Sequence, residues 1–153
     1  MKKQYGIFSI PVIVAALGYF VDIYDLLLFS ITRIESLRSF GLSPEQITIE
    51  GESILIWQMA GLMIGGIVWG MMGDKKGRLS VLFGSIILYS LANIANGFVQ
   101  NTEQIRLIRF IAGLGLAGEL GAGITLVSEL VVKEKRGIAT SLVAGLGLTG
   151  AVA

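Results

Sequence analysis

The chain has 153 residues, of which 54% are hydrophobic and only 15% are charged, with a net charge of +1. Soluble domains are about 45–50% apolar and about 25% charged, so this composition indicates an integral membrane protein. There is no cysteine and no histidine, which excludes disulfides, thiol catalysis and the metal or haem sites built on those ligands. The basic residues lie in short turns and form no surface for nucleic acid, and we expect no metal and no cofactor.

The N-terminus superficially resembles a signal peptide, because Lys2 and Lys3 precede an apolar run. The run continues to about Phe29, contains two aspartates and is followed by no small-residue cleavage site, so it is predicted to be an uncleaved first helix.

Five apolar segments follow one another along the chain. Each is predicted to be a helix, because backbone groups in lipid must be satisfied within their own segment. About 20 residues at 1.5 Å per residue cross a hydrocarbon core of about 30 Å. The segments cover about 7–31, 54–73, 79–99, 105–132 and 137–153. Residues 33–53 are predicted to be a polar loop, in which Ser43 caps a short helix that begins at Pro44.

Basic residues are distributed unequally between the two predicted sides of the membrane. One side carries Lys2, Lys3, Lys75, Lys76, Arg78, Lys133, Lys135 and Arg136, and the other carries Arg33, Arg38 and Arg106. Cytoplasmic loops are enriched in lysine and arginine. The sequence therefore predicts a multi-pass protein of the plasma (inner) membrane with a cytoplasmic N-terminus.

Two carboxylates lie within the first apolar segment. Asp22 and Asp25 are three residues apart and share one face of a helix. An intramembrane carboxylate costs about 2.5 kcal/mol or more at mid-helix, so such groups are candidates for binding substrate or protons. The alternative is that both aspartates lie near the outer interface and are hydrated.

The turn between the second and third segments is a glycine-bracketed cluster of charge. It resembles the loop between the second and third transmembrane helices of the major facilitator superfamily, whose pattern is G-x-x-x-D-R/K-x-G-R-R/K. The matching residues are Gly70, Asp74, Lys75, Gly77 and Arg78, and Leu79 departs from the last basic position.

The fourth segment carries a second resemblance to that superfamily, the pattern R-x-x-x-G-x-G-x-x-G. It is formed by Arg109, Gly113, Gly115 and Gly118. We expect the glycines to serve close helix packing. Arg109 lies inside an apolar segment, so it requires a carboxylate or a water-filled pocket, and the resemblance implies a role in proton transfer.

Glu119 lies about 15 Å farther along the helix than Arg109, near the membrane middle, so we do not expect the two to be direct partners. It is a candidate for substrate or proton binding, and the alternative is a structural hydrogen bond to a neighbouring helix. The stretch around Glu119 resembles the metabolite:proton symporter branch, with Leu120 in place of an aromatic residue, and residues 18–25 resemble the first helix of sugar and metabolite:proton symporters.

A third resemblance is the E-x6-R pattern formed by Glu129 and Arg136. Topology places it on the same side as Asp74, Lys75 and Arg78, and together these charges are predicted to form a gating network. Each exposed pair contributes about 0–1 kcal/mol, and the alternative is a solvated charge run. Elsewhere, Trp57, Gln58 and Trp69 are expected near the membrane interface.

The resemblance implies an all-α integral membrane fold in which residues 1–153 form an N-terminal helical bundle of about five transmembrane helices, incomplete without a C-terminal half. It implies a secondary active transporter and no enzyme: proton-coupled symport of a small polar or anionic metabolite, or a sugar, by alternating access. Its partners would be the lipid bilayer, the substrate and protons. The alternative is a non-transporting membrane scaffold or interaction fragment, which predicts that the intramembrane carboxylates tolerate replacement.

Overall fold

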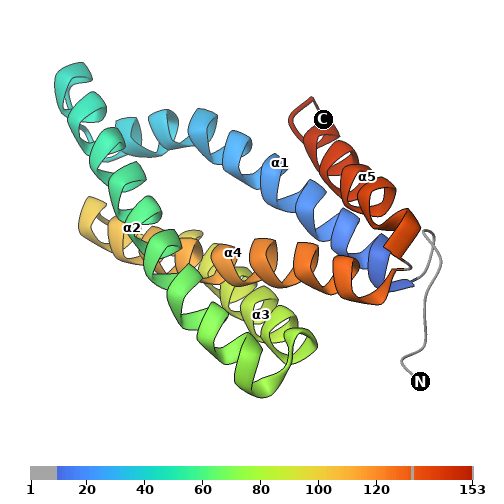
Figure 1. The fold of residues 1–153 in the computed structure, drawn as a ribbon. Coiled ribbons are helices and arrows are strands. Elements are labelled where there is room, and N and C mark those ends of the chain that lie inside the picture. The colour runs from blue at the N-terminus through green and yellow to red at the C-terminus, as the bar shows by residue number, and fades with distance from the viewer. Residues whose placement is uncertain (1–9, 132, 153) are drawn as a thin grey trace.

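A computed structural model describes residues 10–131 and 133–152, and its regular elements are all helices (Figure 1). They are α1 (Ile10–Ser39), α2 (Pro44–Lys76), α3 (Arg78–Asn96), α4 (Thr102–Leu130), the short 3-10 helix η1 (Lys133–Lys135) and α5 (Arg136–Thr149). Helices α1 to α4 are long and apolar enough to cross a membrane. The all-α membrane fold is therefore confirmed. Lys2, Lys3 and the ends of the predicted segments at 7–9, 132 and 153 lie outside the described residues.

Two helices are longer than the apolar pattern predicted. α1 continues past residue 31 to Ser39, and α2 begins at Pro44, so most of the predicted polar loop 33–53 is helical. The expected cap is present, with Gln46 N donating to Ser43 Oγ at 3.4 Å and Ser43 N donating to Gln46 Oε1 at 2.9 Å. It starts the whole of α2 instead of a separate short helix. Apolarity marks only the part of a helix that lies in lipid, and polar residues extend both helices beyond it.

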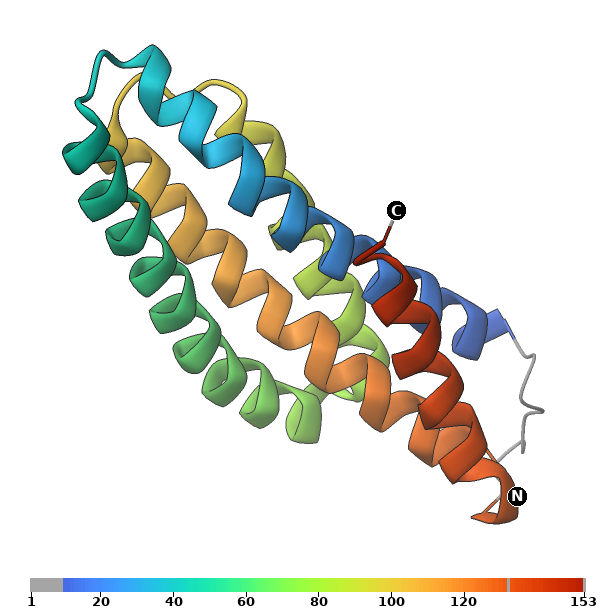
Figure 2. The ribbon, with the colours of Figure 1, turned by 90° about the horizontal axis from the view of Figure 1, so that it is seen from above.

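The helices run alternately up and down, so the connections gather at two ends of the bundle (Figure 2). At one end, Val12 near the start of α1 packs with Val131 after α4 and Ala139 of α5. At the other end, Leu37 of α1 packs with Ile54 of α2 and with the start of α4. The α2–α3 and α4–α5 connections, which carry the basic turns, therefore lie at the same end as the start of α1.

Helix α4 runs through the middle of the bundle, between α2 and α1 when seen from above (Figure 2), and packs most closely on α2 and α3. Glycines permit this approach. A Cβ atom on Gly65 of α2 would lie 2.5 Å from the Leu114 carbonyl oxygen, and one on Gly115 of α4 would lie 2.7 Å from the Tyr89 nitrogen. Ordinary Cβ contacts are 3.4–4 Å, so side chains at these positions would force the helices apart.

Candidate functional site

A buried ion pair joins α1 to α4 in the interior of the bundle. Arg109 is 3% exposed, and its Nη1 lies 3.6 Å from Oδ2 of Asp25. Its guanidinium carbon also lies 3.3 Å from the centre of the Phe29 ring, which is a cation–π contact. The carboxylate that an intramembrane arginine requires is thus supplied by the first helix.

Helix α3 supplies two further partners to the same carboxylate. Tyr89 donates its hydroxyl to Oδ2 of Asp25 at 2.6 Å, and Asn93 donates its amide to that oxygen at 3.3 Å. Tyr89 and Asn93 are four residues apart and therefore lie on one face of α3. One carboxylate oxygen thus accepts two hydrogen bonds from α3 and forms an ion pair with α4, which links both helices to α1.

Arg109 retains donor capacity beyond this ion pair. Among the described residues, neither Nε nor Nη1 of Arg109 has a hydrogen-bond partner. A guanidinium carries five N–H donors in a planar fork that matches a carboxylate. Chemically, the site is a buried guanidinium that keeps donor capacity for an anion, and Asp25 balances its charge.

Asp22 and Glu119 form a separate acidic pair one turn away from this centre. Asp22 is 1% exposed, and its Oδ2 has no hydrogen-bond partner among the described residues. Both carboxylates line a small cavity between α1, α3, α4 and α5, together with Tyr19. Asp22 and Asp25, predicted to share a helix face, thus have different neighbours. Among the described residues, no hydrogen bond or ion pair joins Glu119 to Arg109.

The predicted gating charges are only partly brought together. Arg78 contacts Asp74 at 2.8 Å and Glu129 of α4 at 3.7 Å, which links the α2–α3 turn to the end of α4. Arg136 instead donates its Nε to the carbonyl oxygen of Val131 at 3.1 Å. Lys75 is exposed and forms no ion pair with the described residues. The turn glycine Gly77 has a φ of 89°, a conformation that favours glycine.

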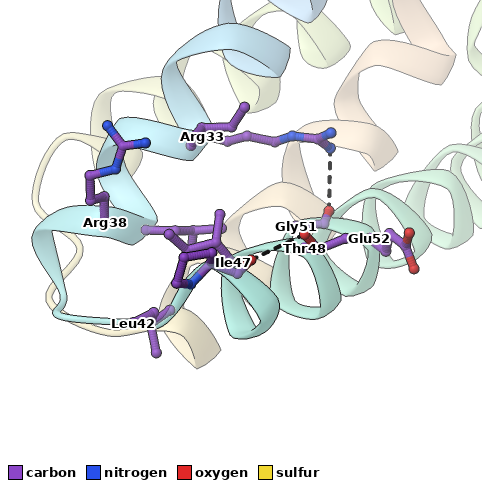
Figure 3. A pocket seen from close by; sticks show the side chains of 10 residues that line it. Arg33, Arg38, Leu42, Ile47, Thr48, Gly51 and Glu52 are labelled. Atoms are coloured by element: carbon purple, nitrogen blue, oxygen red, sulfur yellow. Dashed lines mark hydrogen bonds between the residues drawn. The ribbon is translucent and has the colours of Figure 1, made fainter.

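The opposite end of the bundle carries charges that the sequence reasoning did not connect. Arg106 of α4 forms a half-buried ion pair with Glu50 of α2. At the α1–α2 corner a pocket of about 490 Å³ opens. Figure 3 shows Arg33 reaching across it to donate to the Gly51 carbonyl oxygen, at 3.3 Å.

Comparison with known proteins identifies the fold that carries this arrangement. The family model described as Major Facilitator Superfamily matches residues 12–153. The chain belongs to the major facilitator superfamily. No solved structure matches it.

Relatives in the superfamily are transporters. A Haemophilus influenzae protein, provisionally named a metabolite transport protein, is 34% identical over 85% of this chain and 31% of its own length. The niacin transporter NiaP of Acinetobacter baylyi is 32% identical over 81% of this chain and 27% of its own length. The benzoate transport protein of the same organism is 29% identical over 93% of this chain and 31% of its own length. The chain thus spans about a third of the length of these superfamily relatives.

Several residues of this superfamily member have contacts that the sequence patterns did not indicate. Trp69, which was expected near the membrane interface, donates its Nε1 to the Leu114 carbonyl oxygen at 2.7 Å, within the α2–α4 contact. Gln58 is also buried, and its amide atoms have no partner among the described residues. Tyr89 was not singled out at all. Its four-residue spacing from Asn93 on an apolar helix was the available signal.

Proposed function

We propose that this chain is the N-terminal part of a secondary active transporter that carries small organic carboxylates together with protons. One observation carries the proposal: a guanidinium buried in the bundle interior keeps hydrogen-bond donors that no described residue uses. Buried charges are retained in membrane helices where they serve a pathway or a ligand. Two relatives are named for niacin and benzoate, which are both aromatic monocarboxylic acids, and this supports an anionic cargo over a sugar.

Binding of the cargo would proceed by exchange of anions at Arg109. In the empty site Asp25 balances the guanidinium from 3.6 Å, beyond ordinary hydrogen-bond distance. A substrate carboxylate would accept hydrogen bonds from the N–H groups of Arg109 that no described residue uses. Phe29, which packs against the guanidinium, would offer an apolar surface to the ring of an aromatic acid.

The charges around Arg78 would bias the two states of the carrier. The contacts of Arg78 with Asp74 and Glu129 tie the α2–α3 turn to the end of α4. A network of such pairs shifts a conformational equilibrium by no more than its differential stability in the two states, a few kcal/mol. The positive residues of this end support a cytoplasmic orientation, with the N-terminus inside, in the inner membrane.

A second helical bundle would complete the substrate site. The superfamily places substrates at the midplane between two related bundles, and this chain spans about a third of its relatives. We therefore propose that a C-terminal half, joined to this chain in a longer reading frame, supplies the opposite wall. Alternating access would be the rocking of one bundle against the other.

The test is uptake of labelled nicotinate and benzoate into proteoliposomes that contain the complete reading frame. We expect the labelled acid to accumulate inside when the outside is more acidic than the inside, and we expect a protonophore to abolish this accumulation. Arg109→Lys keeps the positive charge but loses the planar guanidinium. We therefore expect this variant to lose most of its binding of nicotinate and benzoate. Absence of gradient-dependent uptake of either acid would refute the proposal. Full uptake by the Arg109 variant and by Asp25→Asn would show that this pair does not bind the cargo, whereas the scaffold alternative predicts no uptake by any variant or by the wild type.

A further inference from the structure

We propose that Asp22 and Glu119 together hold the transported proton, as one carboxylic acid hydrogen-bonded to one carboxylate, while Asp25 serves only as the counter-charge of Arg109. The inference rests on the proposed proton-coupled function and assigns its proton to particular atoms. The proton would pass from water at one membrane face to the pair and return to water at the other face, with no covalent change in either side chain.

Glu119 can approach α1 because Gly18 has no side chain. Gly18 lies one turn before Asp22 on the same face of α1. The Oε1 atom of Glu119 occupies the space that a Cβ on Gly18 would fill. The Glu119 carboxyl group therefore reaches α1 beside the face that carries Asp22, and both side chains line one cavity.

Among the described residues that line the cavity, none carries a positive charge that could balance these two carboxylates. The cavity is lined otherwise by Tyr19 and apolar residues of α1, α3, α4 and α5, and none of its described lining residues is lysine or arginine. The titratable groups that face Asp22 are Tyr19 and Asp25 of α1, Tyr89 of α3 and Glu119 of α4, while the cavity lining from α5 is Val143. All of these titratable groups are acidic. Two like charges in an apolar cavity repel strongly, so one bound proton resolves the conflict.

The Oδ2 atom of Asp22 has no hydrogen-bond partner among the described residues, which also points to a ligand. A buried carboxylate oxygen with no donor is costly, and a proton shared with a neighbouring carboxyl group supplies the donor. Among the described residues no group of three or more histidine, cysteine, aspartate or glutamate side chains could hold a metal ion. Hard cations take about six oxygen ligands, and two carboxylates on intact helices do not provide them. The ligand that fits is therefore a proton.

Asp25 differs from this pair in its surroundings. Its Oδ2 already faces donors from Tyr89, Asn93 and Arg109. An added proton on that oxygen would have to displace one of them. The two aspartates of α1 therefore have different roles: Asp25 balances the charge of Arg109, and Asp22 binds the proton beside Glu119.

The pair can be tested on the 153-residue chain itself in lipid nanodiscs, without any transport. Infrared difference spectra over a pH titration report the C=O stretch of protonated carboxylic acids. We expect a band that the double variant Asp22→Asn/Glu119→Gln removes and that Asp25→Asn retains. Glu103→Gln, which replaces an exposed carboxylate at the start of the same helix, is the matched control and should also retain it.

Three results of the pH titration would overturn the assignment. These are a wild-type chain without such a band, a band that survives in the double variant, and a band that Asp25→Asn abolishes. Removal of the band by sodium ions at fixed pH would assign the site to a metal cation and would overturn it as well.

A transport measurement in the complete carrier separates this inference from the proposed function. We expect Asp22→Asn and Glu119→Gln each to exchange labelled carboxylate across the membrane, which also shows that they fold. Neither should accumulate it under a pH gradient, so the concentrations inside and outside become equal. Full accumulation by both variants would overturn the proton pair alone. A wild-type carrier without proton-driven uptake would overturn the proposed function and leave the spectroscopic test of the pair standing.

Discussion

Addition of one methyl group to α2, at Gly65, tests the helix packing that positions the site. Gly65 faces α4, and a Cβ atom there would lie 2.5 Å from the Leu114 carbonyl oxygen, 2.8 Å from its Cα and 2.9 Å from the Ala117 Cβ. None of these atoms is the end of a flexible side chain, so the two helices must separate. Gly66 is the next residue along the same helix, and a Cβ there meets nothing within 4 Å.

The pair of variants Gly65→Ala and Gly66→Ala therefore isolates the steric cost. Alanine gains about 1 kcal/mol of helix propensity over glycine at both positions. Overpacking of a close contact costs about 1–3 kcal/mol and applies only to Gly65. We expect Gly66→Ala to be neutral or stabilised by up to about 1 kcal/mol, and Gly65→Ala to be less stable than Gly66→Ala by about 1–3 kcal/mol.

Unfolding of the chain from mild micelles by increasing fractions of denaturing detergent, followed by helical circular dichroism, measures this difference. Equal stability of the two variants would refute the close α2–α4 packing. So would a larger loss for Gly66→Ala than for Gly65→Ala.

Other contacts give further predictions. Tyr89→Phe removes the hydroxyl donor to Asp25 and should destabilise the bundle by about 0.6–1.7 kcal/mol in the same assay. A double-mutant cycle with Asp25→Asn that shows no coupling energy between the two side chains would contradict the hydrogen bond. Glu50→Gln leaves the half-buried Arg106 without its counter-charge and should cost about 1–3 kcal/mol. The charge-swapped double variant of Glu50 and Arg106 should recover part of that loss, and failure to recover any would argue against the pair. Glu129→Gln should change stability by less than about 1 kcal/mol, because this side chain is half exposed at 3.7 Å from its partner; a larger loss would show that it is more buried in the membrane.

The sequence predicted the parts of this molecule that depend on one helix at a time. Apolar length and the alternation of basic turns are local properties, so the helices, their order and the shared end of the basic turns followed from them. The need of Arg109 for a carboxylate also followed, because an isolated guanidinium is unstable in lipid whatever surrounds it.

Features that depend on the rotation of one helix against another could not be predicted in the same way. Spacing placed Asp22 and Asp25 on one face of α1. Helix α1 packs on α4 and α5 and meets α3 only through side chains, so a small rotation along the helix gives the two aspartates different neighbours. Tyr89 became a partner of Asp25 only through the position of α3. Trp69 points inward because Gly118 of α4 leaves room for its ring, and no property of α2 alone reveals that space.

The most direct test of the account asks whether the Asp25–Arg109 centre faces a water-filled, substrate-accessible path and not lipid. The 153 residues contain no cysteine, so once any cysteine in the remainder of the complete carrier is replaced, single cysteines introduced here report without background. Asn93→Cys places a thiol beside Asp25 without altering a charge, and Leu91→Cys, on an exposed position of the same helix, is the matched control. In the complete carrier we predict that a membrane-impermeant maleimide labels Asn93→Cys but not Leu91→Cys, and that benzoate protects against labelling. Labelling confined to Leu91→Cys, or labelling of Asn93→Cys that carboxylates leave unchanged, would contradict the account.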